Sequence, residues 1–213
     1  YIKNNKPNSK IIVLDQKDKF SKQALFSNGW KELYGDLIDW RAAQFGGKVV
    51  SVDPVKKIVV TEDEEVQADV LNYIPNQKAS QLAFDSGLVA DGKDWCDIHP
   101  KTFESKLVKN VHVIGDASNA APMPKSAFSA STQGKVVALQ IARMLKQQEP
   151  LNPPKLANTC YSLLSPNYGI SIAAVYNALD DKIQNVDGAG GVSPATDPDG
   201  HIRILEAKYA YAW

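Results

Sequence analysis

The segment from residue 111 to residue 127 combines residue types that suit a polar, flat ligand. An apolar run, residues 111–114, ends at Gly115, and a glycine lets backbone approach a ligand with no Cβ in the way. Asp116 follows with a carboxylate that accepts hydrogen bonds from a polyol such as ribityl or ribose. After a Pro-rich loop a helix is predicted to begin at Ser126, so its N–H groups face that loop. The pattern alone is compatible with a flavin, a nucleotide or no ligand.

The cysteines and histidines give no metal-binding pattern. Cys96 and Cys160 are the two cysteines of the chain, and they lack the CxxC spacing of a zinc or thioredoxin-like site. The three histidines are scattered without HxH or HExxH grouping. We therefore predict no metal site. Cys96, in a Trp-Cys-Asp sequence, is expected to be a small buried apolar residue rather than a reactive thiol.

The composition of the chain argues against a nucleic-acid partner and against a membrane-spanning segment. The 213 residues carry 24 basic and 24 acidic side chains, which gives no net field to attract nucleic acid or a membrane surface. Apolar residues make up 44% of the chain, enough for a core, but no apolar run approaches the roughly 20 residues of a membrane span. We expect neither a nucleic-acid partner nor a membrane-spanning segment.

The N-terminal third is predicted to be α/β. Residues 10–16 are typical of a fully buried strand of a parallel sheet that ends in Asp15. Asp15 is either an ordinary solvated residue or the ribose-binding acid of a dinucleotide fold whose first strand is missing. Residues 18–46 are mostly helical in pattern, and residues 47–75 indicate a three-stranded meander with turns at Asp53-Pro54 and at residues 62–65.

The rest of the chain is predicted to have an α/β part followed by an α+β part. A polar, irregular stretch precedes a buried strand at residues 111–114, and a helix runs from about Ser126 to Gln148. A Pro-rich linker, residues 149–155, leads to strands around a Ser-Pro-Asn-Tyr-Gly turn. Residues 187–200 are predicted to be a loop, and the chain ends in the opening of a helix.

Several long strings closely resemble the flavoprotein subunit of flavocytochrome c sulfide dehydrogenase. They are NVHVIGDAS, PMPKSAFSASTQGKVVA, FSKQALFSNGWKELYGDLIDWR, WCDIHPKTFESKLVKNVHVIGDAS and NTCYSLLSPNYGISIAAVY. The similarity runs over essentially the whole chain, and strings of this length are far more specific than any short motif.

The resemblance implies a partial two-dinucleotide-binding-domain flavoprotein of the disulfide-reductase-like type. Residues 1–78 would be the latter part of an NAD-like domain, residues 79–150 the second segment of an FAD-binding domain, and residues 151–213 most of a family-specific C-terminal domain. The chain has no GxGxxG sequence to cradle the FAD pyrophosphate. We therefore expect a C-terminal fragment that lacks the N-terminal FAD phosphate-binding segment and binds FAD weakly or not at all.

Site residues are likewise implied by the resemblance. Cys160 would be one member of a redox-active cysteine pair beside the flavin, and the other member would lie in the missing N-terminal part. Lys125 and the helix N-terminus at Ser126 could supply the positive field that a reactive thiolate requires. Whether Cys160 is free or pairs with Cys96 stays open. The residues expected near FAD are Gly115, Asp116, Ala117, Pro124, Lys125, Ser126, Ala127 and Trp213.

The implied activity is the oxidation of sulfide by a periplasmic flavoprotein that passes electrons to a cytochrome c subunit. One alternative is a relative of sulfide:quinone reductase or NADH dehydrogenase, which would require a membrane-contacting C-terminus or an intact NAD loop. Another is a non-catalytic interaction module that holds no flavin. Missing sheet partners would also expose strand edges and apolar surface, so self-association of the fragment is expected.

Overall fold

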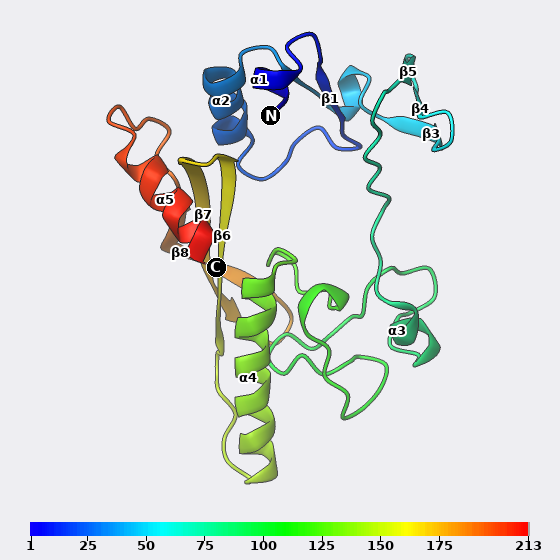
Figure 1. The fold of residues 1–213 in the computed structure, drawn as a ribbon. Helices are drawn as coiled ribbons and strands as arrows, with labels where there is room; N and C mark the ends of the chain where they lie inside the picture. The colour runs from blue at the N-terminus through cyan, green and yellow to red at the C-terminus, as the bar shows by residue number, and fades with distance from the viewer. Residues whose placement is uncertain (213) are drawn as a thin grey trace.

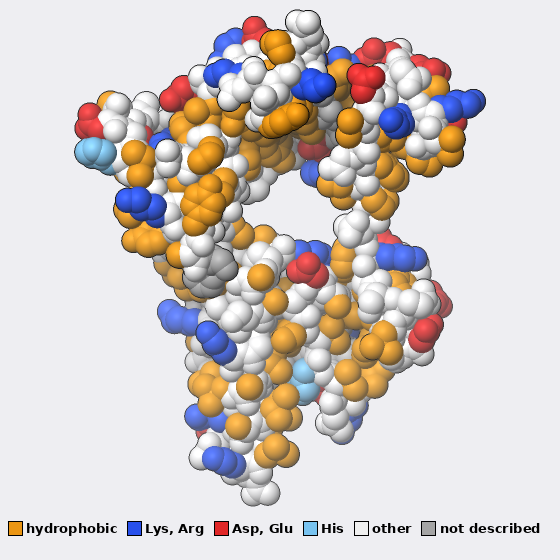
Figure 2. Space-filling view, viewed as in Figure 1, with side chains coloured by type: hydrophobic (Ala, Val, Ile, Leu, Met, Phe, Trp, Pro, Cys, Tyr) orange, Lys and Arg blue, Asp and Glu red, His pale blue; other side chains and the backbone are white. Residues whose placement is uncertain are grey.

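The computed structural model describes residues 1–212, which form a mixed α/β fold with three small sheets (Figure 1). Figure 2 shows an opening between the N-terminal elements and the part of the molecule that contains α4. Residues 68–78 bridge this opening on one side, and the C-terminal sheet bridges it on the other. The N-terminal elements are α1 (Ile2–Asn5), β1 (Ile11–Leu14), α2 (Gln23–Tyr34), β2 (Ile38–Arg41), η1 (Ala43–Phe45), β3 (Val49–Asp53), β4 (Ile58–Thr61) and β5 (Glu65–Gln67). The remaining elements are α3 (Gln81–Asp85), η2 (Gly115–Ala117), α4 (Ala127–Leu145), β6 (Lys155–Ser165), β7 (Tyr168–Ala178), β8 (Ile183–Val192) and α5 (His201–Ala212).

The first sheet pairs β1 with β2 in parallel, with Ile11 opposite Ile38. The prediction of a parallel strand at residues 10–16 is confirmed, but full burial is wrong, since Ile12 and Val13 are each 36% exposed. The helical prediction for residues 38–41 is also wrong. Gly35 ends α2 with a φ of +61°, a conformation suited to glycine, and the chain then turns back to pair with β1.

The second sheet is the antiparallel meander β3-β4-β5 that the sequence predicts. Asp53 closes the first turn by accepting hydrogen bonds from the N–H groups of Val55 and Lys56. Thr61 organises the second turn, where its hydroxyl oxygen accepts from the N–H groups of Asp63 and Glu64. Short polar side chains that bond to nearby backbone are the usual means of fixing such turns.

The third sheet, β6-β7-β8, is antiparallel and is covered by a helix on each face. Asn158 of β6 is hydrogen-bonded to Ser126 at the start of α4. Tyr161, three residues further along β6, contacts Tyr209 of α5. Because side chains alternate along a strand, these contacts lie on opposite faces. The loop prediction for residues 187–192 is wrong, since Gly190 and Gly191 lie in β8 opposite Ala174 and Ala173. The C-terminal helix is confirmed as α5.

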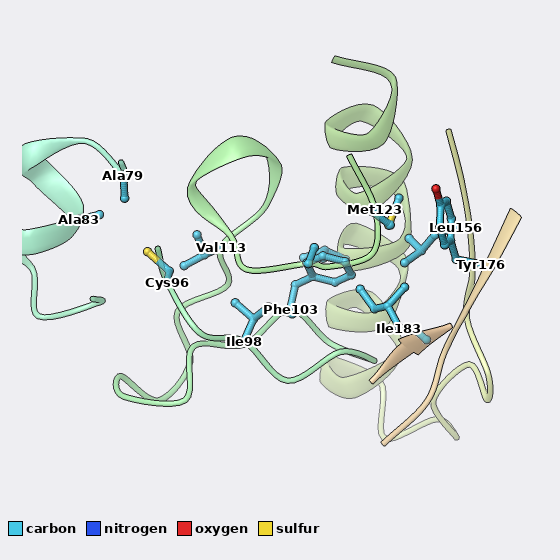
Figure 3. Close-up of a cluster of buried hydrophobic side chains, with 13 residues drawn as sticks. Ala79, Ala83, Cys96, Ile98, Phe103, Val113, Met123, Leu156, Tyr176 and Ile183 are labelled. Atoms are coloured by element: carbon cyan, nitrogen blue, oxygen red, sulfur yellow. The ribbon is translucent and has the colours of Figure 1, made fainter. Parts of the chain in front are cut away.

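The prediction of a buried strand at residues 111–114 is wrong. The segment is extended, but its backbone bonds only to residues 103–105 in an isolated bridge, and Ile114 is 40% exposed. No strand among residues 1–212 lies beside it to build a sheet. Val113 still packs into the largest core cluster, around the fully buried Phe103 and Cys96 (Figure 3). The apolar pattern therefore marks burial here, not strand pairing.

Gly169 lets α5 pack directly on β7. A Cβ at this position would lie 2.3 Å from the backbone nitrogen of Ala207, which cannot move without shifting the helix. We predict that Gly169→Ala lowers the free energy of unfolding by about 2–3 kcal/mol, since overpacking against backbone is not relieved by a side-chain rotation. Urea-induced unfolding followed by circular dichroism measures the change.

Gly191→Ala is the matched control in the same sheet. A Cβ there has no neighbouring atom within 4 Å. We expect a change smaller than about 0.5 kcal/mol for this variant. Equal losses for the two variants would contradict a specific close approach of α5 at Gly169.

Candidate functional site around Asn158 and Cys160

The start of α4 is fixed by a local cap. Ser126 has extended backbone, and its side-chain oxygen accepts a hydrogen bond from the N–H of Ser129 at 3.0 Å. This is the usual N-cap arrangement, so the predicted helix start is confirmed at Ala127. Figure 1 shows this end of α4 pointing toward the N-terminal elements. The first turn of α4 thus presents N–H groups and the positive end of the helix dipole in that direction.

Gly115 brings the loop before α4 close to the helix. Its φ is +67°, and a Cβ would meet the Cβ of Ala130 at 3.2 Å. The Gly115 N–H donates to Oε1 of Gln133, which is 2% exposed, at 2.7 Å. Asp116 and Ala117 continue in the short helix η2, where the Asp116 side chain is exposed. Gly115 is therefore required for the loop to approach α4, and Asp116 stays available to solvent or a ligand.

Lys125 holds this loop through its ammonium group. The Nζ atom donates to the carbonyl oxygens of Asp116 at 2.6 Å and Ser118 at 2.9 Å, and it lies 3.7 Å from the centre of the Trp95 ring. Burial lowers the pKa of Lys125, and the nearby Asp116 carboxylate opposes this effect. These contacts attach Lys125 to the loop and to Trp95, and its expected role as a cation near Cys160 stays a prediction.

A pocket of about 180 Å³ opens beside this loop. The residues that line it include Gly115, Trp95, Lys125, the α4 N-cap Ser126, and Ser129 and Gln133 of α4. Pro124 also borders the pocket, so four of the predicted cofactor residues come together here. The pocket combines an aromatic ring, a helix N-terminus and backbone without a Cβ.

Cys160 lies on the face of β6 that is turned toward α4. It pairs with Ile172 of β7 and is partly buried. The side-chain amide of Asn158, two residues earlier on the same face, donates to the Cys160 sulfur at 3.3 Å. The amide oxygen of Asn158 accepts from the hydroxyls of Ser126 at 2.6 Å and Ser129 at 3.0 Å. One buried side chain therefore joins the cap of α4 to the cysteine.

Cys96 has a different environment. It is fully buried in the core cluster that contains Phe103 and Val113, as predicted, and neither cysteine is in a disulfide in the described structure. Burial raises the pKa of Cys96, and the nearby Asp97 carboxylate raises it further, whereas Lys125 lowers it. Cys96 is thus held as a neutral thiol at neutral pH, unsuited to nucleophilic attack.

The Asp15 carboxylate is hydrogen-bonded to Lys17 and Trp40. Its carboxylate accepts from the backbone N–H and the ammonium of Lys17, at 3.0 and 2.9 Å, and from the Trp40 ring N–H at 3.4 Å. Burial raises the pKa of Asp15, but these bonds outweigh it and leave the pKa lowered. Neither the solvated nor the ribose-binding interpretation describes these contacts. Trp213, the last predicted site residue, lies outside the described residues.

Sequence reasoning missed Asn158 and Lys22. Asn158 could have been found, because an i, i+2 spacing on a predicted strand puts it on the same face as Cys160. Lys22 bonds through its ammonium to the Ser162 hydroxyl at 2.8 Å, across 140 positions of sequence. No local sequence pattern predicts a contact between residues so far apart in the chain.

Residues 1–212 contain no cluster of three or more His, Cys, Asp or Glu side chains placed to hold a metal ion. Among the described helices, none has the length and hydropathy needed to cross a membrane.

The pocket, the capped helix and the nearby cysteine are compatible with a flavin-binding oxidoreductase, and the family comparisons indicate that class. Residues 1–75 match the central domain of the flavoprotein chain of sulfide dehydrogenase [flavocytochrome c]. Residues 152–213 match the flavin-binding domain of flavocytochrome c sulphide dehydrogenase. The chain belongs to the family of flavocytochrome c sulfide dehydrogenase flavoprotein chains. The match to a flavin-binding domain supports FAD as the cofactor of the intact protein.

Removing the Asn158 side chain should destabilise the protein. Asn158→Ala leaves two hydroxyls and the Cys160 sulfur without their buried partner, and we expect a loss of about 2 kcal/mol in the free energy of unfolding. Chemical denaturation of the purified chain measures this loss.

Asn185→Ala is the control, because Asn185 lies in the same sheet with an exposed side chain. A change below about 0.5 kcal/mol is expected there. If Asn158→Ala changed the free energy of unfolding as little as Asn185→Ala does, the hydrogen bonds of Asn158 would not stabilise the junction between α4 and β6.

Proposed function

We propose that Cys160 is the sulfide-reactive cysteine of a flavoprotein that oxidises sulfide, one member of a redox-active pair. The observation that supports this most is the Asn158 side chain, which links the sulfur to the N-cap of α4. The cap belongs to the segment that the resemblance assigns to the flavin. A thiol that reacts with sulfide and a group that accepts electrons must lie close together, and Asn158 connects the two regions.

The described residues fit the flavin end of FAD. Gly115 offers backbone without a Cβ, Asp116 offers an exposed acceptor for ribityl hydroxyls, and α4 directs its positive end toward the pocket. Trp95 adds an aromatic wall. The pyrophosphate needs a different set of groups, usually the N–H groups of a GxGxxG loop, and the sequence has no such motif. Tight binding of FAD therefore requires groups beyond those of this pocket.

The proposed reaction begins at a disulfide between Cys160 and a second cysteine. Hydrosulfide sulfur bonds to one sulfur of the pair, the S–S bond breaks, and the other sulfur leaves as a thiolate. Bound FAD supplies the capacity to accept the electron pair that this exchange leaves on the cysteines. The Asn158 amide nitrogen lies 3.3 Å from the Cys160 sulfur as a donor and its oxygen lies 3.5 Å away as an acceptor, so Asn158 orients this sulfur beside the cap of α4. Cys96 does not serve as the second cysteine in this proposal, because it is fully enclosed in the core.

The family name and the resemblance support the wider setting of this proposal. Electrons would leave singly to a cytochrome c subunit, and the protein would work in the periplasm. We also propose that β1, α2 and β2 belong to an NAD-like domain and that η2 and α4 belong to an FAD domain, as in two-dinucleotide-domain flavoproteins. Self-association through the exposed residues of β1 remains a prediction.

Cys160→Ser should abolish sulfide oxidation without loss of FAD. In the complete flavoprotein with its cytochrome c subunit, we expect sulfide-dependent cytochrome c reduction to fall at least about a hundredfold, because serine cannot form the disulfide. The flavin absorbance per protein should stay unchanged, since the pocket beside α4 does not include Cys160.

Cys96→Ala is the matched control, and near-normal turnover is expected because this thiol packs in the core. Near-normal turnover of Cys160→Ser would refute the assignment. For the polypeptide as given, a purified preparation with no flavin absorbance would support the alternative of a non-catalytic interaction module.

A further inference from the structure

We propose that Lys22 is a positioning residue that stabilises the thiolate of Cys160. This inference rests on the proposed reaction of Cys160. Lys22 comes from the segment before α2, in the region matched by the central-domain family model, whereas Cys160 comes from the region matched by the flavin-binding model. The proposed reactive site is therefore shared between two parts of the chain that are far apart in sequence.

Hydrogen bonding places the Lys22 ammonium on the face of β6 that holds Cys160. Its Nζ atom donates to the hydroxyl of Ser162 at 2.8 Å, and Ser162 lies two residues beyond Cys160 on the strand. Residues two apart on a strand share a face and lie about 6.6 Å apart. Asn158 lies two residues before Cys160, so the cysteine has an amide donor on one side and a cation on the other.

Close packing of α2 on the C-terminal sheet holds Lys22 in this place. Leu25 of α2 is buried in a cluster with Leu164 and Ile170 of the sheet. A Cβ at Gly29 would come within 2.3 Å of Leu164 Cδ2, which shows how near the helix lies to β6. The Tyr34 hydroxyl donates to the Leu164 carbonyl at the far end of α2. Three contacts along α2 therefore fix the position of Lys22, its N-cap.

The backbone conformation of Lys22 supports a specific position for its side chain beside β6. Lys22 is the N-cap of α2 and has a φ of +61°, in the left-handed region that residues with a Cβ seldom adopt. Ser, Thr, Asp and Asn are the preferred N-cap residues, and Lys22 makes no side-chain cap bond. The ammonium of this lysine lies 5.7 Å from the centre of the Phe26 ring of α2 and donates to the Ser162 hydroxyl at 2.8 Å, and these contacts explain a lysine at a strained cap position.

The charges around Cys160 are consistent with this role. Burial lowers the pKa of Lys22, and attraction to Cys160 and to the Glu206 carboxylate of α5 opposes that effect. Tyr176, on the β7 position facing Leu156 of β6, has its pKa raised by burial and then by the charge of Cys160. Of these groups Lys22 alone is cationic. Lys125 is bound to the loop carbonyls instead.

The test is the pH dependence of Cys160 alkylation by iodoacetamide in the chain as given, with the labelled residue identified by peptide mass. Iodoacetamide is neutral, so a change in protein charge does not attract or repel it. We expect Lys22→Met to move the midpoint of the rate profile to higher pH and to slow alkylation at pH 7 by roughly three- to tenfold. Rates of the variant and the unmodified protein should converge at high pH, where both thiols are ionised.

Three further variants separate charge from structure. Lys22→Arg keeps the cation and should keep the midpoint, and Lys22→Gln serves as a second neutral variant should Lys22→Met fail to fold. Lys19→Met removes an exposed charge from the same segment and should leave the midpoint unchanged. An unchanged midpoint in a folded neutral variant of Lys22, or an equal shift in Lys19→Met, overturns the proposal. Because alkylation needs neither FAD nor sulfide, its outcome is independent of the turnover test on Cys160→Ser.

Discussion

The buried amide of Asn158 is the interaction on which the arrangement of the candidate site depends. At 2% exposure it cannot turn to solvent, so each of its polar atoms requires a partner within the protein. Its oxygen accepts from two hydroxyls at the start of α4, and its nitrogen donates to the Cys160 sulfur. The position of α4 along β6 is thereby fixed to the position of the cysteine. A small shift of either element would leave a buried polar group unpaired.

The sequence allowed the local parts of this arrangement to be predicted, because their causes are local. The start of α4 follows from the serine cap and the preceding Pro-rich loop, and the meander follows from its turn sequences at Asp53-Pro54 and at residues 62–65. Burial of Cys96 was expected because a free cysteine usually behaves as a small apolar residue. The resemblance identified the family, whereas residue patterns alone left a flavin, a nucleotide and an unliganded turn equally open at Gly115 and Asp116.

The features that were missed depend on pairing between distant segments. Residues 38–41 have a helical apolar spacing, yet hydrogen bonds to β1 make them a parallel strand, and those bonds outweigh a weak local preference. Residues 111–114 show the opposite case, because an apolar run without a neighbouring strand among the described residues stays a single extended segment. The glycines of β8 suggested a loop, but they permit a bulged strand that follows β7 closely.

The length of the β6-β7 hairpin explains how Cys160 can lie between side chains that contact two distant helices, α4 and α2. Each strand has 11 residues and spans about 35 Å. One end of β6 packs against α4, and the other packs against α2 on the far side of the opening in Figure 2. Cys160 is the sixth residue of the 11 in β6, so its two same-face neighbours, Asn158 and Ser162, connect it to α4 and to Lys22 respectively. A shorter hairpin would reach only one of these helices, and the thiol would then have either the amide donor or the cation but not both.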